Sequence, residues 1–135
     1  MKLSDKKKDI KEMFEVFDDP MDKYVQIIEL GKKNTGIPDE DKNDNNRIFG
    51  CASLAWIKTI NNGNNTYKIL IDSDTFIVKG LLSILQFIVN DTSKEEINEL
   101  NINSILLEIG LEDSITSQRT NGFMNALNKI KEHIN

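Results

Sequence analysis

The stretch from Phe76 to Val89 constrains the fold more than any other part of this chain. Ten of its fourteen residues are apolar, and drawn as a helix they lie on almost every side. Because a helix that is apolar all round must be buried all round, the rest of the chain has to form layers around it. We therefore expect a central buried helix from about Thr75 to Asn90, with Gly80 marking a close approach of another backbone. The preceding Asp72-Ser73-Asp74 offers side chains that could cap this helix.

A hairpin is predicted just before the central helix. The segments 54–60 and 66–71 are rich in β-branched and aromatic residues, and the Asn- and Gly-rich stretch 61–65 between them is a strong turn signal. Residues 47–49 read as a further short strand. The fold class is therefore α+β, with a small antiparallel β-sheet of about three strands packed against several α-helices.

Amphipathic helices account for most of the remaining chain. Asp19 is a candidate N-cap with Pro20 at the first helical position, and Ser93 with Glu96 forms a capping-box pattern. The expected helices are 4–17, 20–31, 93–100, 103–109 and one from about residue 116 to the end. A chain of 135 residues fits one domain, so residues 1–135 are expected to share a single core.

Charge and composition narrow the function. A net charge of −5 disfavours nucleic acid as a partner, because binding there depends on Lys and Arg neutralising phosphates. The charged amino terminus does not read as a signal peptide, and no apolar run is long enough to cross a bilayer. With one cysteine, a reducing compartment is expected, which favours a cytoplasmic location. An organelle such as a plastid is the alternative if a leader has been removed.

Two arginines, Arg47 and Arg119, stand among fifteen lysines. Lysine fills nearly every other cationic position, so the planar guanidinium fork at these two sites is a candidate for a specific contact. Ordinary surface charge is the alternative. Arg119 falls in the first turn of its predicted helix, where a cation is mildly unfavourable. Lys79, inside the central helix, fits a side chain that reaches out from the rim of the core.

Cys51 is the only cysteine, and it lies in a small-residue corner between the polar loop and the predicted hairpin. A single thiol excludes an internal disulfide, a paired redox motif and a multi-cysteine zinc site. Two interpretations stay open, a structural cysteine and a reactive sulfur. The only histidine, His133, is two residues from the carboxyl end, which disfavours a cysteine hydrolase. The acidic cluster at residues 39–41 lacks the EF-hand pattern, so no metal site is expected.

Four stretches together resemble the SufE-like sulfur acceptor family, whose members serve cysteine desulfurases. They are Tyr24-Val25-Gln26-Ile27-Ile28-Glu29-Leu30-Gly31, Asn46-Arg47-Ile48-Phe49-Gly50-Cys51-Ala52-Ser53-Leu54-Ala55-Trp56, Asp72-Ser73-Asp74-Thr75-Phe76-Ile77-Val78-Lys79-Gly80-Leu81 and Arg119-Thr120-Asn121-Gly122. The Gly-Cys-x-Ser-x-x-Trp block followed by the Asp-Ser-Asp and Lys-Gly-Leu block is the specific part. The departures are Ala55, where the family usually has valine, and Thr120, where serine is common.

This resemblance implies that Cys51 accepts the terminal sulfur of a persulfide on a partner cysteine desulfurase of the SufS-like kind. The acceptor would stimulate the desulfurase and carry the sulfur to an iron-sulfur cluster scaffold of the SufBCD-like kind. Pyridoxal phosphate would belong to the desulfurase, and this chain would hold no cofactor. It would be a sulfur-transfer accessory protein without independent turnover. The transfer is similar in chemistry to thiol-disulfide exchange, for which one cysteine is enough.

The resemblance also gives candidate roles to residues around Cys51. In the family the loop cysteine is tucked against an apolar pocket, which Trp56 and Leu81 would line here. Plain core packing is the alternative for Trp56, and helix capping for Asp74. Arg119 would orient the loop or pair with a carboxylate or thiolate across the interface. The expected loop and partner-interface residues are Gly50, Ala52, Ser53, Asp74, Lys79 and Arg119.

Two other functions stay in competition with the sulfur acceptor. One is a non-catalytic adaptor that activates a desulfurase by contact alone, with Cys51 purely structural. The other is an independent thiol enzyme with a small-molecule substrate. Transfer of sulfur to Cys51 separates the acceptor from both.

Overall fold

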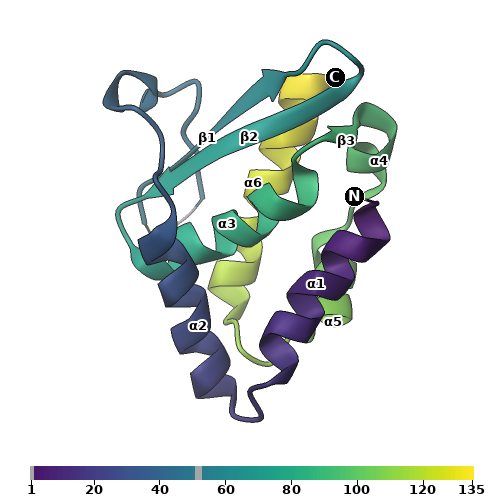
Figure 1. The fold of residues 1–135 in the computed structure, drawn as a ribbon. Helices are drawn as coiled ribbons and strands as arrows, with labels where there is room; N and C mark the ends of the chain where they lie inside the picture. The colour runs from purple at the N-terminus through teal and green to yellow at the C-terminus, as the bar shows by residue number, and fades with distance from the viewer. Residues whose placement is uncertain (1, 51–52) are drawn as a thin grey trace.

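The computed structural model describes residues 2–50 and 53–135 of the chain, and it has the expected α+β class. Figure 1 shows a long two-stranded ribbon lying across a group of helices. The elements in chain order are α1 (Leu3–Glu15), α2 (Pro20–Lys33), the 3-10 turn η1 (Asp39–Asp41), β1 (Ala55–Asn61), β2 (Thr66–Ser73), α3 (Phe76–Val89), β3 (Thr92–Ser93), α4 (Lys94–Glu99), α5 (Ile102–Ile109) and α6 (Ser117–Ile134).

Helix α3 is the central element, as its apolar composition predicts. Eight of its residues are buried, and it contacts β2 on one side and α2 on another, with α1 and α6 also against it. Leu85 and Ile88 have no exposed surface. The burial of nearly all its apolar side chains is the main reason why the other elements gather around this helix.

The sheet has three antiparallel strands in the order β1-β2-β3. Ala55 and Ile57 on β1 and Ile69 and Ile71 on β2 are fully buried, because alternate side chains of a strand point to one face and this face meets α3 and α6. The third strand is β3, which pairs with β2 through Tyr67 and Thr92. A strand of two residues carries no periodic pattern, so the sequence could not reveal it.

The segment 47–49 is not a third strand of the sheet, which corrects the expectation for it. Arg47 forms only an isolated bridge with Trp56. The ladder is completed by the Ile48 N–H, which donates to the Ala55 carbonyl at 2.8 Å, and by the Ile57 N–H, which donates to the Asn46 carbonyl at 2.7 Å. Two residues after Ile48, Gly50 takes a left-handed backbone conformation. Residues 46–48 and 55–57 therefore lie side by side. They flank residues 49–54, which we call the Cys51 segment.

Two glycines let α2 and α3 pack with their backbones in contact. A Cβ atom on Gly80 would overlap the Ile27 carbonyl, and one on Gly31 would overlap the Phe76 carbonyl. The expected close approach at Gly80 is thus confirmed, and its partner is α2. The Asp19 cap of α2 is confirmed as well, since its Oδ1 accepts from the Met21 N–H at 2.9 Å.

Helices α1 and α2 form a V joined by a short turn, and α1 lies against α5 (Figure 1). The Ser93–Glu96 capping box opens α4 as expected. Within the described part of the chain, no helix combines the length and apolar character needed to cross a membrane.

Candidate functional site

A pocket next to the Cys51 segment lies between α3 and the amino-terminal half of α6. Its volume is about 240 Å³. Its lining is formed by Ser53, Val78, Leu81, Leu82, Thr116, Gln118, Arg119, Gly122 and Phe123. Cys51 and Ala52 lie outside the described residues, but Ser53 at the end of their segment lines this pocket. Four of the lining residues, Val78, Leu81, Leu82 and Phe123, are apolar, and Arg119 is the charged one.

The carboxyl-terminal end of the Cys51 segment is held by residues that precede α3. The Leu54 N–H donates to Asp74 Oδ1 at 3.0 Å, and the Leu54 carbonyl accepts from the Asp74 N–H at 3.1 Å and from Ser73 Oγ at 2.7 Å. Ser53 Oγ and Thr75 Oγ1 are 3.1 Å apart. Asp74 is therefore an anchor for residue 54.

The expected capping of α3 by Asp72-Ser73-Asp74 is wrong for the two carboxylates, whereas Ser73 Oγ accepts from the Thr75 N–H at 3.3 Å, at the start of the helix. The N-cap residue is Thr75, and its own side chain makes no capping hydrogen bond. The carboxylates of Asp72 and Asp74 are already used by Ile37 and Leu54. These partners are 35 and 20 residues away in sequence, so local pattern could not reveal the competition.

The amino-terminal end of the segment is held from α6. Asn125 Nδ2 donates to the Phe49 carbonyl at 3.2 Å. Gly50 has a φ of +88°, and a Cβ atom there would lie 2.5 Å from Asn125 Nδ2. The backbone conformation favours glycine immediately before Cys51, whereas the end of the Asn125 side chain could shift to make room for a Cβ atom.

Arg119 lines the pocket from the first turn of α6. Its guanidinium carbon lies 5.5 Å from the centre of the Tyr24 ring, a cation–π distance. Thr116 caps the helix by accepting from the Arg119 N–H at 3.4 Å. The ring of Tyr24 thus offsets the unfavourable position of a cation near a helix amino terminus.

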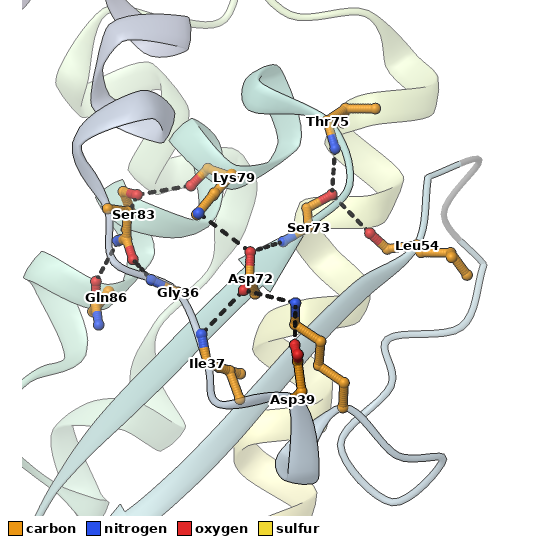
Figure 2. Close-up of polar contacts among 12 residues, drawn as sticks. Gly36, Ile37, Asp39, Leu54, Asp72, Ser73, Thr75, Lys79, Ser83 and Gln86 are labelled. Carbon is orange, nitrogen blue, oxygen red and sulfur yellow. Dashed lines mark hydrogen bonds and ion pairs between the residues drawn. The ribbon is translucent and has the colours of Figure 1, made fainter.

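Asp72 and Lys79 form a polar cluster beside the pocket, shown in Figure 2. Lys79 Nζ is 3.3 Å from Asp72 Oδ1, and Lys42 Nζ is 3.3 Å from Asp72 Oδ2. The Ile37 N–H donates to Asp72 Oδ2 at 3.1 Å. Lys79 is only 15 % exposed, and its partners tie α3 to the sheet and to the loop after α2. It does not line the pocket.

Trp56 also lies away from the pocket, contrary to the expected lining. It projects from β1 toward Lys42, whose Nζ is 5.4 Å from the indole ring. The alternation of β1 explains this, because Ala55 and Ile57 take the helix-covered face and Trp56 takes the other. Leu81 does line the pocket, and Asp74 is linked to the Cys51 segment through Leu54.

Sequence reasoning missed several lining residues, although a signal for them existed. Val78, Leu81 and Leu82 follow the spacing of one helix face, as do Arg119, Gly122 and Phe123. Since Leu81 and Arg119 were both expected near Cys51, the helical spacing around each of them could have predicted the other lining residues. The contact of Asn125 with Phe49 spans 76 residues and had no local signal.

The arrangement suits a small, soft and polarizable group with partial negative charge. Val78, Leu81, Leu82 and Phe123 give the pocket apolar walls, and the guanidinium of Arg119 belongs to the same lining. A sulfur atom fits an apolar wall, and a nearby cation favours the thiolate over the thiol. The chain therefore has, next to its cysteine segment, a place that can accommodate a sulfur anion.

Comparison with known proteins gives the family. Residues 8–134 match the family model for SufE, described as an Fe-S metabolism associated domain. An uncharacterized SufE-like protein of Rhizobium etli is 34 % identical over 122 residues, which cover 88 % of this chain and 82 % of that protein. One of Rhizobium meliloti is 33 % identical over 121 residues, covering 87 % and 86 %.

The fold recurs in a solved structure. The solution structure of a hypothetical protein from Thermus thermophilus superimposes with a TM-score of 0.76 over 96 % of this chain and 93 % of that one, at 18 % identity. This similarity concerns the fold, while the family match spans almost every residue from α1 to α6. The chain therefore belongs to the SufE family.

Proposed function

We propose that this protein accepts sulfur on Cys51 from a cysteine desulfurase and delivers it to an iron-sulfur cluster scaffold. Membership of the SufE family supports a sulfur-transfer role in Fe-S metabolism. The observation that carries the finer proposal is the position of the only cysteine, one residue after Gly50 and two before Ser53, which lines an apolar pocket together with the guanidinium of Arg119.

The transfer step needs one thiol on this chain. The Cys51 thiolate attacks the outer sulfur of the persulfide on the desulfurase, a new sulfur-sulfur bond forms on Cys51, and the old one breaks as the desulfurase thiolate leaves. The reaction exchanges one sulfur atom between a persulfide and a thiolate, so it needs no oxidant or reductant. Pyridoxal phosphate stays on the desulfurase. Removal of the persulfide sulfur from the desulfurase accounts for the proposed stimulation.

The pocket and the residues that hold the Cys51 segment each have a role in this proposal. The pocket protects the sulfur between transfers, and Arg119 favours its anionic form. Asp74 and Asn125 fix the two ends of the segment, through Leu54 and Phe49. Such a carrier suits a reducing compartment such as the cytoplasm, where a free thiol persists.

Mass spectrometry with Cys51→Ser tests the proposal. The wild-type chain, incubated with a cysteine desulfurase and cysteine and kept free of reductant, should gain the mass of one sulfur atom, removable by dithiothreitol. Cys51→Ser should gain none and should lose the stimulation of sulfide release. Circular dichroism and a binding measurement with the desulfurase show whether the variant is folded and still docks.

Two results would contradict the proposal. Full stimulation by Cys51→Ser would favour the adaptor that acts by contact alone. A wild-type chain that docks but gains no sulfur would exclude the carrier role.

A further inference from the structure

A second pocket, with several polar and charged lining residues, lies on the other half of α6, between that helix and the segment that leads into Gly50. Its volume is about 230 Å³. Its lining includes Arg47, Phe49, Asn125, Asn128, Lys129 and Glu132. Arg47 is one of the two arginines of a lysine-rich chain, and the proposed sulfur transfer does not use it.

Arg47 is held in place before any ligand binds. Its backbone is fixed by the bridge to Trp56, and its guanidinium carbon lies 5.1 Å from the centre of the Phe49 ring. A guanidinium stacked on an aromatic ring keeps its planar fork in one orientation. The side chain therefore presents a preorganised set of donors to the pocket.

One donor of Arg47 is buried. Among the residues described on either side of the Cys51 gap, the buried Nε of Arg47 has no hydrogen-bond partner, and no acidic group there forms an ion pair with Arg47. Leaving a charged donor buried and unpaired is costly. The buried Nε is itself out of reach of a ligand, so a group that enters the pocket lined by Arg47 would meet the terminal Nη groups of the fork, which are not among the buried atoms without a partner.

The other polar groups indicate the charge of that acceptor. Asn125, Asn128, Lys129 and Glu132 follow the spacing of one face of α6. Lys129 adds a second cation and the asparagines add amide donors. Glu132 adds one negative charge, which opposes a doubly charged anion such as phosphate. A planar monoanion matches the fork of Arg47 best.

We infer that this pocket binds a carboxylate, with Arg47 as its main donor and Lys129 as the second cation. The carboxylate comes from an acidic side chain of a docked protein or from a free small acid. Binding to the free protein does not depend on the sulfur-acceptor role. The position beside Phe49 and Gly50 places the bound carboxylate next to the amino-terminal end of the Cys51 segment.

Nuclear magnetic resonance of the Arg47 Nε–Hε group tests this inference, because Nε shares the guanidinium with the Nη groups that would bind the carboxylate. Titration of the whole chain with sodium acetate, against sodium chloride at the same ionic strength, should give a saturable shift of this resonance with acetate alone. No shift, or the same shift with chloride, would overturn the inference.

Variants separate a specific site from general charge attraction. Arg47→Lys keeps the charge but removes Nε and the fork, and acetate affinity, followed at the Asn125 and Asn128 side-chain amides, should fall about tenfold, the typical effect of losing a charge-assisted hydrogen bond. Glu132→Gln should raise the affinity. Lys68→Gln removes an exposed charge on β2 and should leave it unchanged. An equal loss in Lys68→Gln would contradict the site.

Competition identifies the source of the carboxylate. If saturating acetate weakens binding of the desulfurase, and Arg47→Lys weakens it as well, an acidic side chain of that partner occupies the pocket. If acetate binds at Arg47 without competing, the ligand is a free small carboxylate. Failure of the desulfurase to bind at all would count against the proposed function and leave the acetate result standing.

Discussion

Asp72 connects three parts of the molecule through one carboxylate. It lies at the end of β2 and reaches Ile37 in the loop after α2, Lys79 in α3 and Lys42 beyond η1. Figure 2 shows Ile37, Ser73 and Lys79 around Asp72. Burial acts to raise the pKa of Asp72, but the N–H groups of Ile37 and Ser73 and the charge of Lys79 outweigh it, so the pKa lies below its usual value. The charged form is the one that the fold stabilises.

Asp72→Asn should therefore destabilise the protein near neutral pH, by about 1 to 3 kcal/mol for a buried polar group that loses its charged partners. A carboxylate with a lowered folded-state pKa stabilises above its unfolded pKa of 3.8. That contribution is lost as the pH falls through the folded-state value. The difference between wild type and variant should shrink below about pH 4.

Urea unfolding at several pH values measures this difference. Asp44→Asn, at an exposed carboxylate in the loop before Arg47, is the matched control and should change stability little. A difference for Asp72→Asn that stays constant from pH 7 to pH 3 would contradict the assigned role of its charge.

The contact between α2 and α3 shows how two elements are specified together. Gly80 and Gly31 remove the side chains that would hold the helices apart, and each backbone meets a carbonyl of the other helix. The sequence predicted that another backbone packs against Gly80. It could not name α2, because the spacing of residues within α3 carries no information about which other helix approaches.

Gly80→Ala tests this contact. Alanine is the better helix former by about 1 kcal/mol, yet its Cβ would overlap the Ile27 carbonyl, and overpacking costs about 1 to 3 kcal/mol. We expect net destabilisation and a change in the pocket lined by Leu81. Ser104→Ala, at an exposed position of α5, is the matched control and should be neutral or slightly stabilising. Thermal unfolding followed by circular dichroism compares the two, and a more stable Gly80→Ala would contradict the backbone contact.

At the scale of the whole molecule, one continuous core joins the helices to one face of the sheet. Lys6 ties the first helix to the far side of α3. Its Nζ donates to the Ile88 carbonyl at 3.4 Å, to the Asn90 carbonyl and to Thr92 Oγ1 at 3.3 Å. Burial lowers the pKa of Lys6, against the opposing charges of Asp91 and Glu96. An ammonium at the carboxyl end of α3 satisfies carbonyls that the helix leaves free.

Lys6→Ala should lower the free energy of unfolding of the whole domain by about 1 to 3 kcal/mol, because buried acceptors lose their donor. Lys8→Ala, on an exposed part of the same helix, should have little effect. Urea unfolding measures both variants. Equal effects would mean that Lys6 acts only through helix propensity or net charge.

The sequence by itself determined the α+β class, the buried central helix, the hairpin, most helix boundaries and the family. These follow from periodicity, capping residues and short motifs, which are local properties of the chain. It also singled out Cys51 and Arg119. The tertiary structure decided the third strand, the partners of Asp72 and Asp74, the position of Trp56 and the contacts of Arg47. Each of these depends on which distant segment competes for the same donor, acceptor or face, and that competition is settled only when the chain is folded.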